Sequence, residues 1–321
     1  MRKITKTLLG IGGAFCLIGA LLFIIGFTSG GTKYVHATNL NSMNAQEDSK
    51  ESANRFTLKK TEIPDFTSLN INLEDSDLNI EESPNEKSYI EYAQATKDKK
   101  NPVSYSIENG TLTLKEAGNT GASYYINVDI SFLQAALSSK NIEDYTTESS
   151  KYENYVTLYL PKDKLVSSAK IYLGYGDFYV KNAAFDTINI KLDDGDFDAN
   201  TLTANSGKLT FSYGDCDLQK ASLGNISLTS KDGDLTVNEL TLSGKTKIAL
   251  SYGDAEITLN DSTKKVSGFD LATHYGTITA SGLNGNKTVD EDDDVNTFQS
   301  DSKDGKTKLA IDSKDGDITV K

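Results

Sequence analysis

The residues with the clearest chemical potential are aspartates that recur directly after glycines in the second half of the chain. Carboxylate oxygens are the ligands that Ca²⁺ prefers in proteins, so aspartates brought into one row predict a calcium-binding ladder. The alternative is that each aspartate accepts backbone hydrogen bonds at its turn. We favour this alternative because the chain lacks the Gly-Gly-x-Gly-x-Asp calcium repeat. The aspartates of the series are Asp177, Asp196, Asp215, Asp234, Asp254 and, near the C-terminus, Asp317.

Tyrosines precede several of the same glycines and alternate there with aspartates. The residue before the glycine is Asp194, Asp232 or Asp315 in the other repeats. Aromatic rings in a row would suit contact with a glycan or a protein. The simpler interpretation is that these are ordinary strand tyrosines, which are common. The predicted interaction surface consists of Tyr175, Tyr213, Tyr252 and Tyr275.

The chain offers little for catalysis. Its histidines are His36 and His274, and neither has a nucleophile motif near it in sequence. There is no nucleophile elbow, HExxH motif, phosphate-binding loop or paired-cysteine zinc spacing. We therefore expect a protein that is not an enzyme and holds no cofactor, with calcium as the one candidate ion. We expect Cys216 to be a small buried hydrophobe, because it occupies an apolar position of a repeat.

A repeated phrase of about 20 residues positions these side chains. Seven glycines mark the phrase, at successive spacings of 19, 19, 19, 20, 23 and 40 residues. The positions two and four residues after each glycine are apolar, and so is the position five residues before it. This period-two pattern on both sides of a glycine predicts two half-buried strands joined by a bend. The glycines are Gly176, Gly195, Gly214, Gly233, Gly253, Gly276 and Gly316.

We predict an all-β fold, a β-solenoid-like stack of two-strand repeats of about 19–20 residues with Gly-Asp bends. The alternative is an antiparallel meander in which each bend is a hairpin turn. The solenoid is favoured because the unit repeats in length as well as in chemistry, which stacks like positions in ladders. The long gap between Gly276 and Gly316 is expected to hold two repeats, one carrying a loop over 284–301.

Weaker forms of the phrase occur earlier in the chain. Residues 69–80 have the same alternation, with Ser76 in place of the glycine. Asn109-Gly110 between apolar alternating residues predicts a hairpin with a two-residue turn. Residues 156–160 read as a strand that Pro161 ends.

An apolar, uncharged run predicts one membrane-spanning helix at the N-terminus. It covers residues 8–27, which is long enough to cross a bilayer core. The basic residues before it place the N-terminus in the cytoplasm and the bulk of the chain outside the cell. The alternative is a signal peptide cleaved after Ala37. The predicted parts are a cytoplasmic stub (1–7), the transmembrane helix (8–27), a polar extracellular tether (28–55), an N-terminal β region with an insertion near 117–154 (56–165) and the Gly-Asp β-repeat region (166–321).

The formal net charge of −13 bears on the partners. An acidic exterior argues against nucleic-acid binding and against docking on anionic lipid through a basic face. Within the insertion, residues 129–137 have helical apolar spacing and predict a short amphipathic helix. The acidic run at 290–294 predicts a solvated loop.

Three features of the chain point to a known family: the [Tyr/Asp]-Gly-Asp phrases between 171 and 259, the returning phrase at 315–317, and the strand before Pro161. Together they resemble the bacterial "putative adhesin" β-strand-repeat family. The resemblance covers about residues 56–321. It implies a membrane-anchored envelope protein of Gram-positive bacteria, as in Lia-type cell-envelope-stress systems. It brings no catalytic residues with it.

We therefore expect a single-pass envelope protein whose extracellular domain is a non-catalytic interaction or sensing module, linked to the envelope-stress response. Its partner would be an envelope protein or a wall polymer, and not nucleic acid. Two alternatives stay open: a surface adhesin that binds host or neighbouring cells, and a calcium-stabilised structural module.

Overall fold

The computed structural model describes residues 55–95, 101–117, 154–290 and 292–321. All of them belong to one compact unit, which comprises Asn54–Ala122 and Ala135–Lys321. Among these described residues, no helix has the length and apolar character needed to cross a membrane. The predicted membrane helix at 8–27, the tether apart from its last residue Arg55, and the predicted short helix at 129–137 lie outside the described residues. Arg55 begins the first described strand and not a tether.

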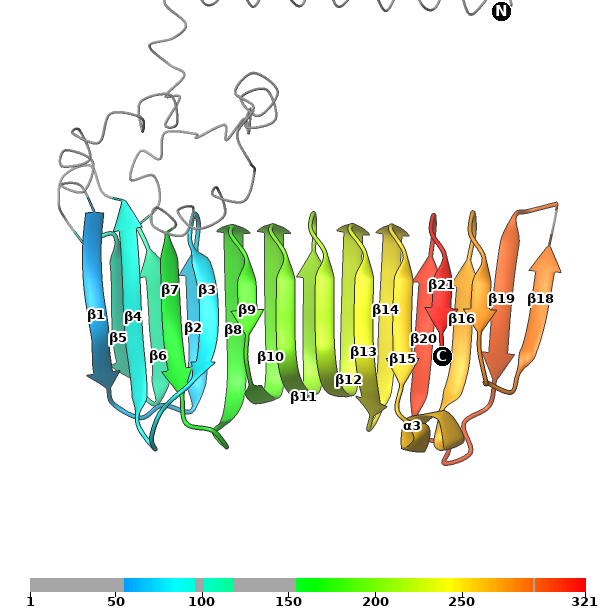
Figure 1. The fold of residues 1–321 in the computed structure, drawn as a ribbon, viewed down its shortest axis with the longest axis horizontal. Helices are drawn as coiled ribbons and strands as arrows, with labels where there is room; N and C mark the ends of the chain where they lie inside the picture. The colour runs from blue at the N-terminus through cyan, green and yellow to red at the C-terminus, as the bar shows by residue number, and fades with distance from the viewer. Residues whose placement is uncertain (1–54, 96–100, 118–153, 291) are drawn as a thin grey trace, which may run out of the picture. The chain divides into compact units, whose positions relative to one another are not determined.

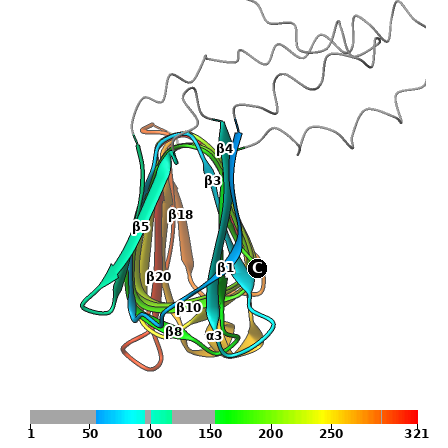
Figure 2. The same cartoon turned by 90° about the vertical axis from the view of Figure 1, so that its left-hand side faces the viewer.

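The described chain folds into a stack of β-coils with two faces (Figure 1). Each coil contributes one strand to face 1, turns at a bend, and contributes the next strand to face 2. Strands of neighbouring coils pair in parallel on both faces. Figure 2 looks along the stack and shows the two faces meeting at the bends. The solenoid prediction is therefore confirmed for the Gly-Asp repeats, because hairpin bends would have made the pairing antiparallel.

Each face is a continuous sheet whose strands follow one another along the stack. In that order, face 1 consists of β5 (Val103–Glu108), β6 (Thr111–Glu116), β2 (Ser68–Leu73), β8 (Leu165–Tyr175), β10 (Ala183–Asp194), the second parts of β11 (Phe197–Phe211) and β12 (Cys216–Asp232), β14 (Lys245–Tyr252), β20 (Lys308–Ser313), β16 (Gly268–Thr273), β19 (Val295–Ser300) and β18 (Asn286–Asp290). Face 2 consists of β1 (Arg55–Ile63), β4 (Ser88–Ala95), β7 (Tyr155–Leu160), β3 (Asp77–Glu82), β9 (Phe178–Val180), the first parts of β11 and β12, β13 (Leu235–Leu242), β15 (Ala255–Leu259), β21 (Ile318–Val320) and β17 (Ile278–Ala280).

Apolar side chains between the two faces form one continuous core. Residues five positions before the bend glycines lie beside one another on neighbouring strands, as Ile171, Ile190 and Leu209 do. Phe178 stacks on Phe197 of the next coil, with ring centroids 5.0 Å apart. Identical positions therefore give each coil the same apolar interface with the next, which is the source of stability expected in a repeat fold.

The single described cysteine lies in this core. Cys216 is buried, as the sequence predicts, and burial raises the pKa of its thiol. The thiol therefore stays protonated at neutral pH and packs as a small hydrophobe.

The order of the coils in the stack differs from their order in the chain at both ends. The last coil of the chain, β20–β21, lies between the β14–β15 coil and the β16–β17 coil and pairs in parallel with both. At the other end the first coil, β2–β3, lies between β6–β7 and β8–β9. The prediction of a loop over 284–301 is wrong, because β18 and β19 pair there as an antiparallel hairpin. This hairpin leads the chain back before its last coil enters the stack.

Antiparallel strands cap both ends of the stack. At one end β5 pairs with β6, and β4 and β1 extend face 2 beyond β7. The predicted hairpin turn between β5 and β6 is confirmed, with φ of 50° at Asn109 and 73° at Gly110. At the other end β19 covers β16, and a short helix, α3 (Asp261–Val266), fills the turn between β15 and β16. Caps of this kind cover strand edges that would otherwise pair with another chain.

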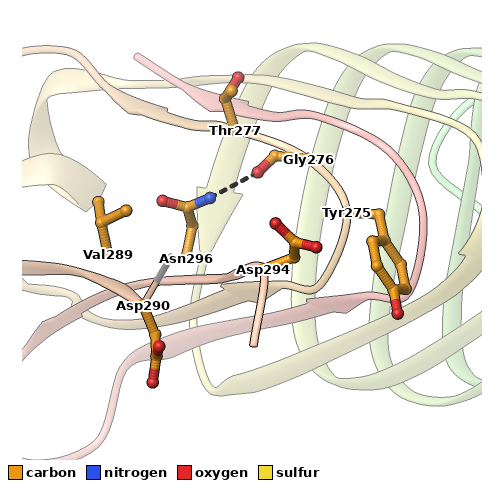
Figure 3. A pocket seen from close by; sticks show the side chains of 7 residues that line it. All are labelled: Tyr275, Gly276, Thr277, Val289, Asp290, Asp294 and Asn296. Carbon is orange, nitrogen blue, oxygen red and sulfur yellow. Dashed lines mark hydrogen bonds between the residues drawn. The ribbon is translucent and has the colours of Figure 1, made fainter. Parts of the chain in front are cut away.

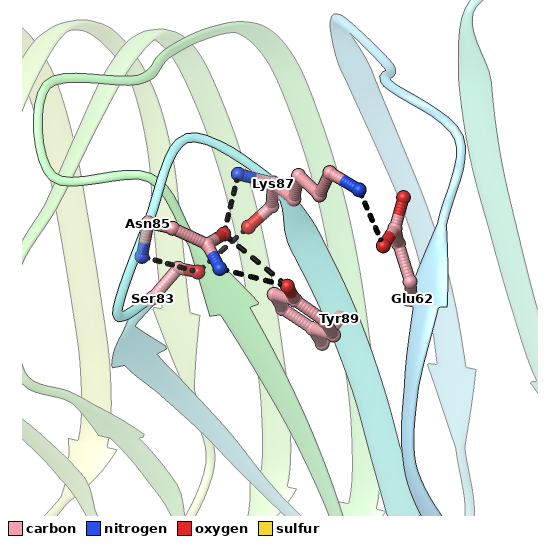
Figure 4. Close-up of polar contacts among 5 residues, drawn as sticks. All are labelled: Glu62, Ser83, Asn85, Lys87 and Tyr89. Atoms are coloured by element: carbon pink, nitrogen blue, oxygen red, sulfur yellow. Dashed lines mark hydrogen bonds and ion pairs between the residues drawn. The ribbon is translucent and has the colours of Figure 1, made fainter.

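The turn from β3 to β4 crosses β7, which pairs with both strands. Asn85 holds this turn: its Oδ1 accepts the Lys87 N–H at 2.9 Å, and its Nδ2 donates to the Tyr89 hydroxyl at 2.9 Å (Figure 4). The Ser83 hydroxyl donates to the Lys87 carbonyl at 2.7 Å. The Lys87 ammonium pairs with Glu62 of β1 at 2.8 Å. These bonds fix the crossing and tie the cap to the first coil.

Candidate functional site

The predicted site residues lie on the bend edge, which consists of the bend glycines with the residue before and after each. At Gly214 the backbone φ is 115°, a conformation that residues with a Cβ rarely adopt. A Cβ at Gly214 would lie 2.2 Å from the carbonyl oxygen of Gly195 in the neighbouring coil. The bends therefore stack backbone on backbone, which explains the glycine in the repeated phrase.

The aspartates after the glycines form a ladder of hydrogen bonds. Oδ1 of each aspartate accepts the backbone N–H of the aspartate in the next coil, at 2.7–2.9 Å. The last bond of the series runs from the Thr277 N–H to Asp317 at 2.8 Å. In stack order the accepting residues are Asp77, Asp177, Asp196, Asp215, Asp234, Asp254 and Asp317. The donor therefore belongs to the next coil, and not to the same turn as the sequence suggested.

The ladder concentrates negative charge along one edge. The pKa of Asp198, in the first part of β11, is raised by burial first and then by the charges of Asp217, Asp196, Asp177 and Asp215. Among the described residues, no group of three or more His, Cys, Asp or Glu side chains is placed to hold a metal ion. The calcium ladder stays a prediction.

Tyrosine and aspartate alternate strictly along the bend edge once the coils are placed in stack order. Because the β20–β21 coil enters between its neighbours, Asp315 separates Tyr252 from Tyr275. The four tyrosines have exposed fractions between 57% and 68%. Every second coil carries one, so neighbouring tyrosines are about 9.6 Å apart along the stack. The full order is Asp75, Tyr175, Asp194, Tyr213, Asp232, Tyr252, Asp315 and Tyr275.

A cleft of about 400 Å³ lies at the bend of the β16–β17 coil, where the bend edge ends (Figure 3). The acidic run that we expected to be a solvated loop contributes two carboxylates to the cleft, from either end of the β18–β19 turn. Asn296 donates a 2.7 Å hydrogen bond to the carbonyl of Gly276 and so holds the hairpin against the last bend. His274 is exposed beside the cleft without lining it. The lining residues are Tyr275, Gly276, Thr277, Val289, Asp290, Asp294 and Asn296.

A buried polar cluster at the other end of the edge was missed from the sequence. Glu116, at the end of β6, is 8% exposed. Its carboxylate accepts the backbone N–H groups of Glu74 at 2.8 Å and Asp75 at 3.0 Å. It also accepts the Ser76 hydroxyl at 3.2 Å and the Gln94 amide at 3.0 Å. Burial raises the pKa of Glu116, and the hydrogen bonds from backbone and serine oppose that rise.

Both long undescribed segments join the described stack at this same edge. Arg55, where β1 begins, is opposite Ala95 at the end of β4, and Ala93 is opposite Tyr155, where β7 begins. β6 ends at Glu116, beside the first bend. The N-terminal segment (1–54) and the insertion (118–153) therefore both connect to the bend edge.

Solved structures of low sequence identity resemble the chain. They include a putative cell adhesion protein from Clostridium sporogenes, with 12% identity, a TM-score of 0.28, and coverage of 82% of this chain and 99% of that one. A putative adhesin from Bacteroides fragilis has 11% identity and a TM-score of 0.39, over 84% and 99% of the two chains. A putative adhesin from Parabacteroides distasonis has 12% identity and a TM-score of 0.33, over 83% and 96%. Among curated proteins, no relative matches the chain.

The family model Toastrack DUF4097 matches residues 66–321. The match begins just before β2 and runs through every Gly-Asp coil to the C-terminus. It confirms the resemblance to the "putative adhesin" repeat proteins, and the chain belongs to the Toastrack DUF4097 family.

Proposed function

We propose that this protein is a membrane-anchored, extracellular module of the cell envelope that binds a partner through its bend edge and catalyses no reaction. The binding serves interaction or sensing close to the membrane, with a link to the response to envelope stress. The observation that carries the proposal is the bend edge itself.

The bend edge has the properties of a contact surface. Its tyrosines are large, mostly exposed and evenly spaced, and among the described residues their hydroxyls have no hydrogen-bond partner. Tyrosine gives much contact area for little loss of side-chain entropy, which suits binding. The aspartate ladder fixes the backbone beneath the rings, so little ordering is needed when a partner binds.

The connection of the N-terminal segment supports a partner near the membrane. The apolar run at 8–27 with basic residues before it is the basis for proposing an anchor with an extracellular domain. A flexible tether over 28–54 would average roughly 30 Å from end to end. Because the described stack begins at Arg55 on the bend edge, this tether keeps that edge within reach of other membrane proteins.

The proposal is tested by photocrosslinking in cells that express the full chain. A photoreactive phenylalanine replaces Tyr213 or Tyr252 on the edge, and a matched control replaces the exposed Asn238 on face 2. We expect the edge positions, and not the control, to capture a membrane protein. Capture of wall polymer alone, or of nothing until foreign cells are added, would contradict the proposal and favour an adhesin.

Adhesion to a host or neighbouring cell is the second candidate. It is favoured by the same exposed tyrosines, since an edge that is open along its length can accept a large ligand. It requires that the chain without residues 1–54 binds intact cells or their glycans, and that cells lacking the ligand are not bound.

A further inference from the structure

Face 1 carries a regular row of lysines on its outer surface. At the position six residues before the bend glycine, Lys170, Asn189, Lys208, Ser227 and Lys247 lie side by side on consecutive strands. Lysine therefore recurs on every second strand, about 9.6 Å apart. All three lysines are exposed.

A second row runs beside the first, two residues nearer the bends. Here Lys115, Asn72, Tyr172 and Lys191 are neighbours on consecutive strands. The second row and the part of the first row from Lys170 to Lys208 line a hollow of about 510 Å³ on β6, β2, β8, β10 and β11. We call these two rows, from β6 to β14, the lysine face.

The lysine face contains no acidic residue, although the chain as a whole has a net charge of −13. Lys191 pairs with Asp193 at its border, at 2.7 Å. The structure places no described carboxylate within ion-pair distance of Lys115, Lys170, Lys208 or Lys247. Cationic and anionic side chains are thus segregated, with the aspartate ladder on the bend edge and unpaired lysines on face 1.

The geometry points to a binding site for a linear polymer of phosphodiester-linked polyols on the lysine face. A lysine ammonium binds phosphate as a point charge and needs no bidentate geometry. The asparagine amides and serine hydroxyl between the lysines can hydrogen-bond the hydroxyl groups between phosphates. At about 9.6 Å the lysines are roughly one Debye length apart, so each can attract its own phosphate with little mutual repulsion.

Other polyanions fit this face less well. A protein surface that docks on a membrane usually protrudes and carries apolar side chains, whereas the lysine face is hollow. The exposed apolar residue on β8 is Leu165, which is 53% exposed and lies at the opposite end of β8 from the bend. A wide nucleic-acid duplex would extend over Asp193 and the aspartate ladder and be repelled there. The inference is independent of the proposed membrane anchor.

The inference is tested by measuring how tightly the purified full-length protein binds fluorescent poly(glycerol phosphate). The test variant is Lys170→Gln/Lys208→Gln/Lys247→Gln. The control is Lys265→Gln/Lys303→Gln/Lys306→Gln, which removes the same charge from exposed lysines away from face 1 strands β6 to β14. We expect the test variant to bind about tenfold or more weakly, with a shallower salt dependence, and the control to bind like wild type. The Lys→Arg triple variant, which keeps the charge, should retain binding and show that folding is intact.

Several outcomes would overturn the inference. Equal weakening in the test and control variants would mean that only net charge matters. Equal binding of polygalacturonate would remove the preference for phosphodiesters. Tighter binding of phosphatidylglycerol vesicles or of single-stranded DNA would assign the face to a membrane or to nucleic acid. Each result is independent of crosslinking at the bend edge, so the two proposals can fail separately.

Discussion

At the residue scale, the bend edge shows how a charged side chain can be part of a backbone structure. Each ladder aspartate accepts the N–H of the next coil, so its charge is partly offset by the donor. Glu116 likewise accepts backbone N–H groups of the neighbouring coil at the N-terminal end of the stack. There the insertion, and not a Gly-Asp bend, connects β6 to β7. Alternation along β6 puts Glu116 on the same side as Leu112 and Leu114, which is the signal in the sequence that it points inward.

Replacing a bend glycine should be far more costly than replacing a turn glycine. Gly282 has a φ of 73°, but no atom lies within 4 Å of the place that a Cβ would take, so Gly282→Ala should cost about 1–2 kcal/mol of left-handed strain. Gly214→Ala adds overlap with the Gly195 carbonyl and should cost roughly 3 kcal/mol or more. Urea unfolding of the two variants measures the difference, and equal losses would mean that the bends are not stacked as described.

Partial burial of Asp198, together with the carboxylates around it, should make stability depend on pH. Its pKa is raised in the folded protein, so the folded state holds this proton more tightly than the unfolded state does. Stability is therefore lost as the pH rises from the ordinary aspartate range through the raised pKa. Asp198→Asn should melt at a higher temperature than wild type at neutral pH, and the advantage should vanish at about pH 3.5.

Asp163→Asn, in an exposed turn away from the ladder, is the control for this pH experiment. It should leave the melting temperature unchanged at both pH values. An advantage of Asp198→Asn that persists at low pH, or that appears equally in the control, would show that the raised pKa of Asp198 is not its cause.

At the scale of elements, the repeat was predictable and its stacking order was not. Period-two alternation around each glycine fixes two strands and a bend, and residues 69–80 show that this holds even with Ser76 at the bend. Every coil, however, offers its neighbours the same apolar ladder, so pattern alone cannot say which coils touch. The lengths of the connections determine the stacking order. The β18–β19 hairpin leads the chain past the end of the stack and back, so that the β20–β21 coil lies between the β14–β15 and β16–β17 coils. The alternation of Tyr252, Asp315 and Tyr275 on the edge follows from that threading.

The aspartate ladder should be stable without calcium, because each Oδ1 already accepts a backbone N–H group. We expect the same melting temperature in millimolar calcium and in chelator. Asp215→Asn/Asp254→Asn keeps an Oδ1 acceptor at both positions and removes two charges. A melting temperature that rises with calcium in the wild type, and fails to rise in this double variant, would establish the calcium ladder instead.

At the scale of the whole described stack, three surfaces differ in chemistry. The bend edge alternates aromatic and acidic groups, face 2 carries Asp198, Asp217 and Glu256 outward, and face 1 carries the lysine face. Net charge averages over these surfaces, which is why composition predicted a uniformly acidic exterior. Their segregation could be recovered only after the coils were placed in register. A rigid stack with distinct faces can hold two partners at once, one on the edge and one on face 1.

The measurement that tests this account most directly is disulfide formation between outward positions of the last three coils. Thr319 lies beside Glu256 on one side and Thr279 on the other, about 4.8 Å from each, so cysteines there are within disulfide range. In a Cys16→Ser background, Glu256→Cys/Thr319→Cys and Thr279→Cys/Thr319→Cys should oxidise readily. Glu256→Cys/Thr279→Cys should not, since about 9.6 Å separates the strands. In chain order the β16–β17 coil would lie between the other two coils. Ready oxidation of Glu256→Cys/Thr279→Cys, with none of Glu256→Cys/Thr319→Cys, would therefore contradict this account and remove the alternating edge.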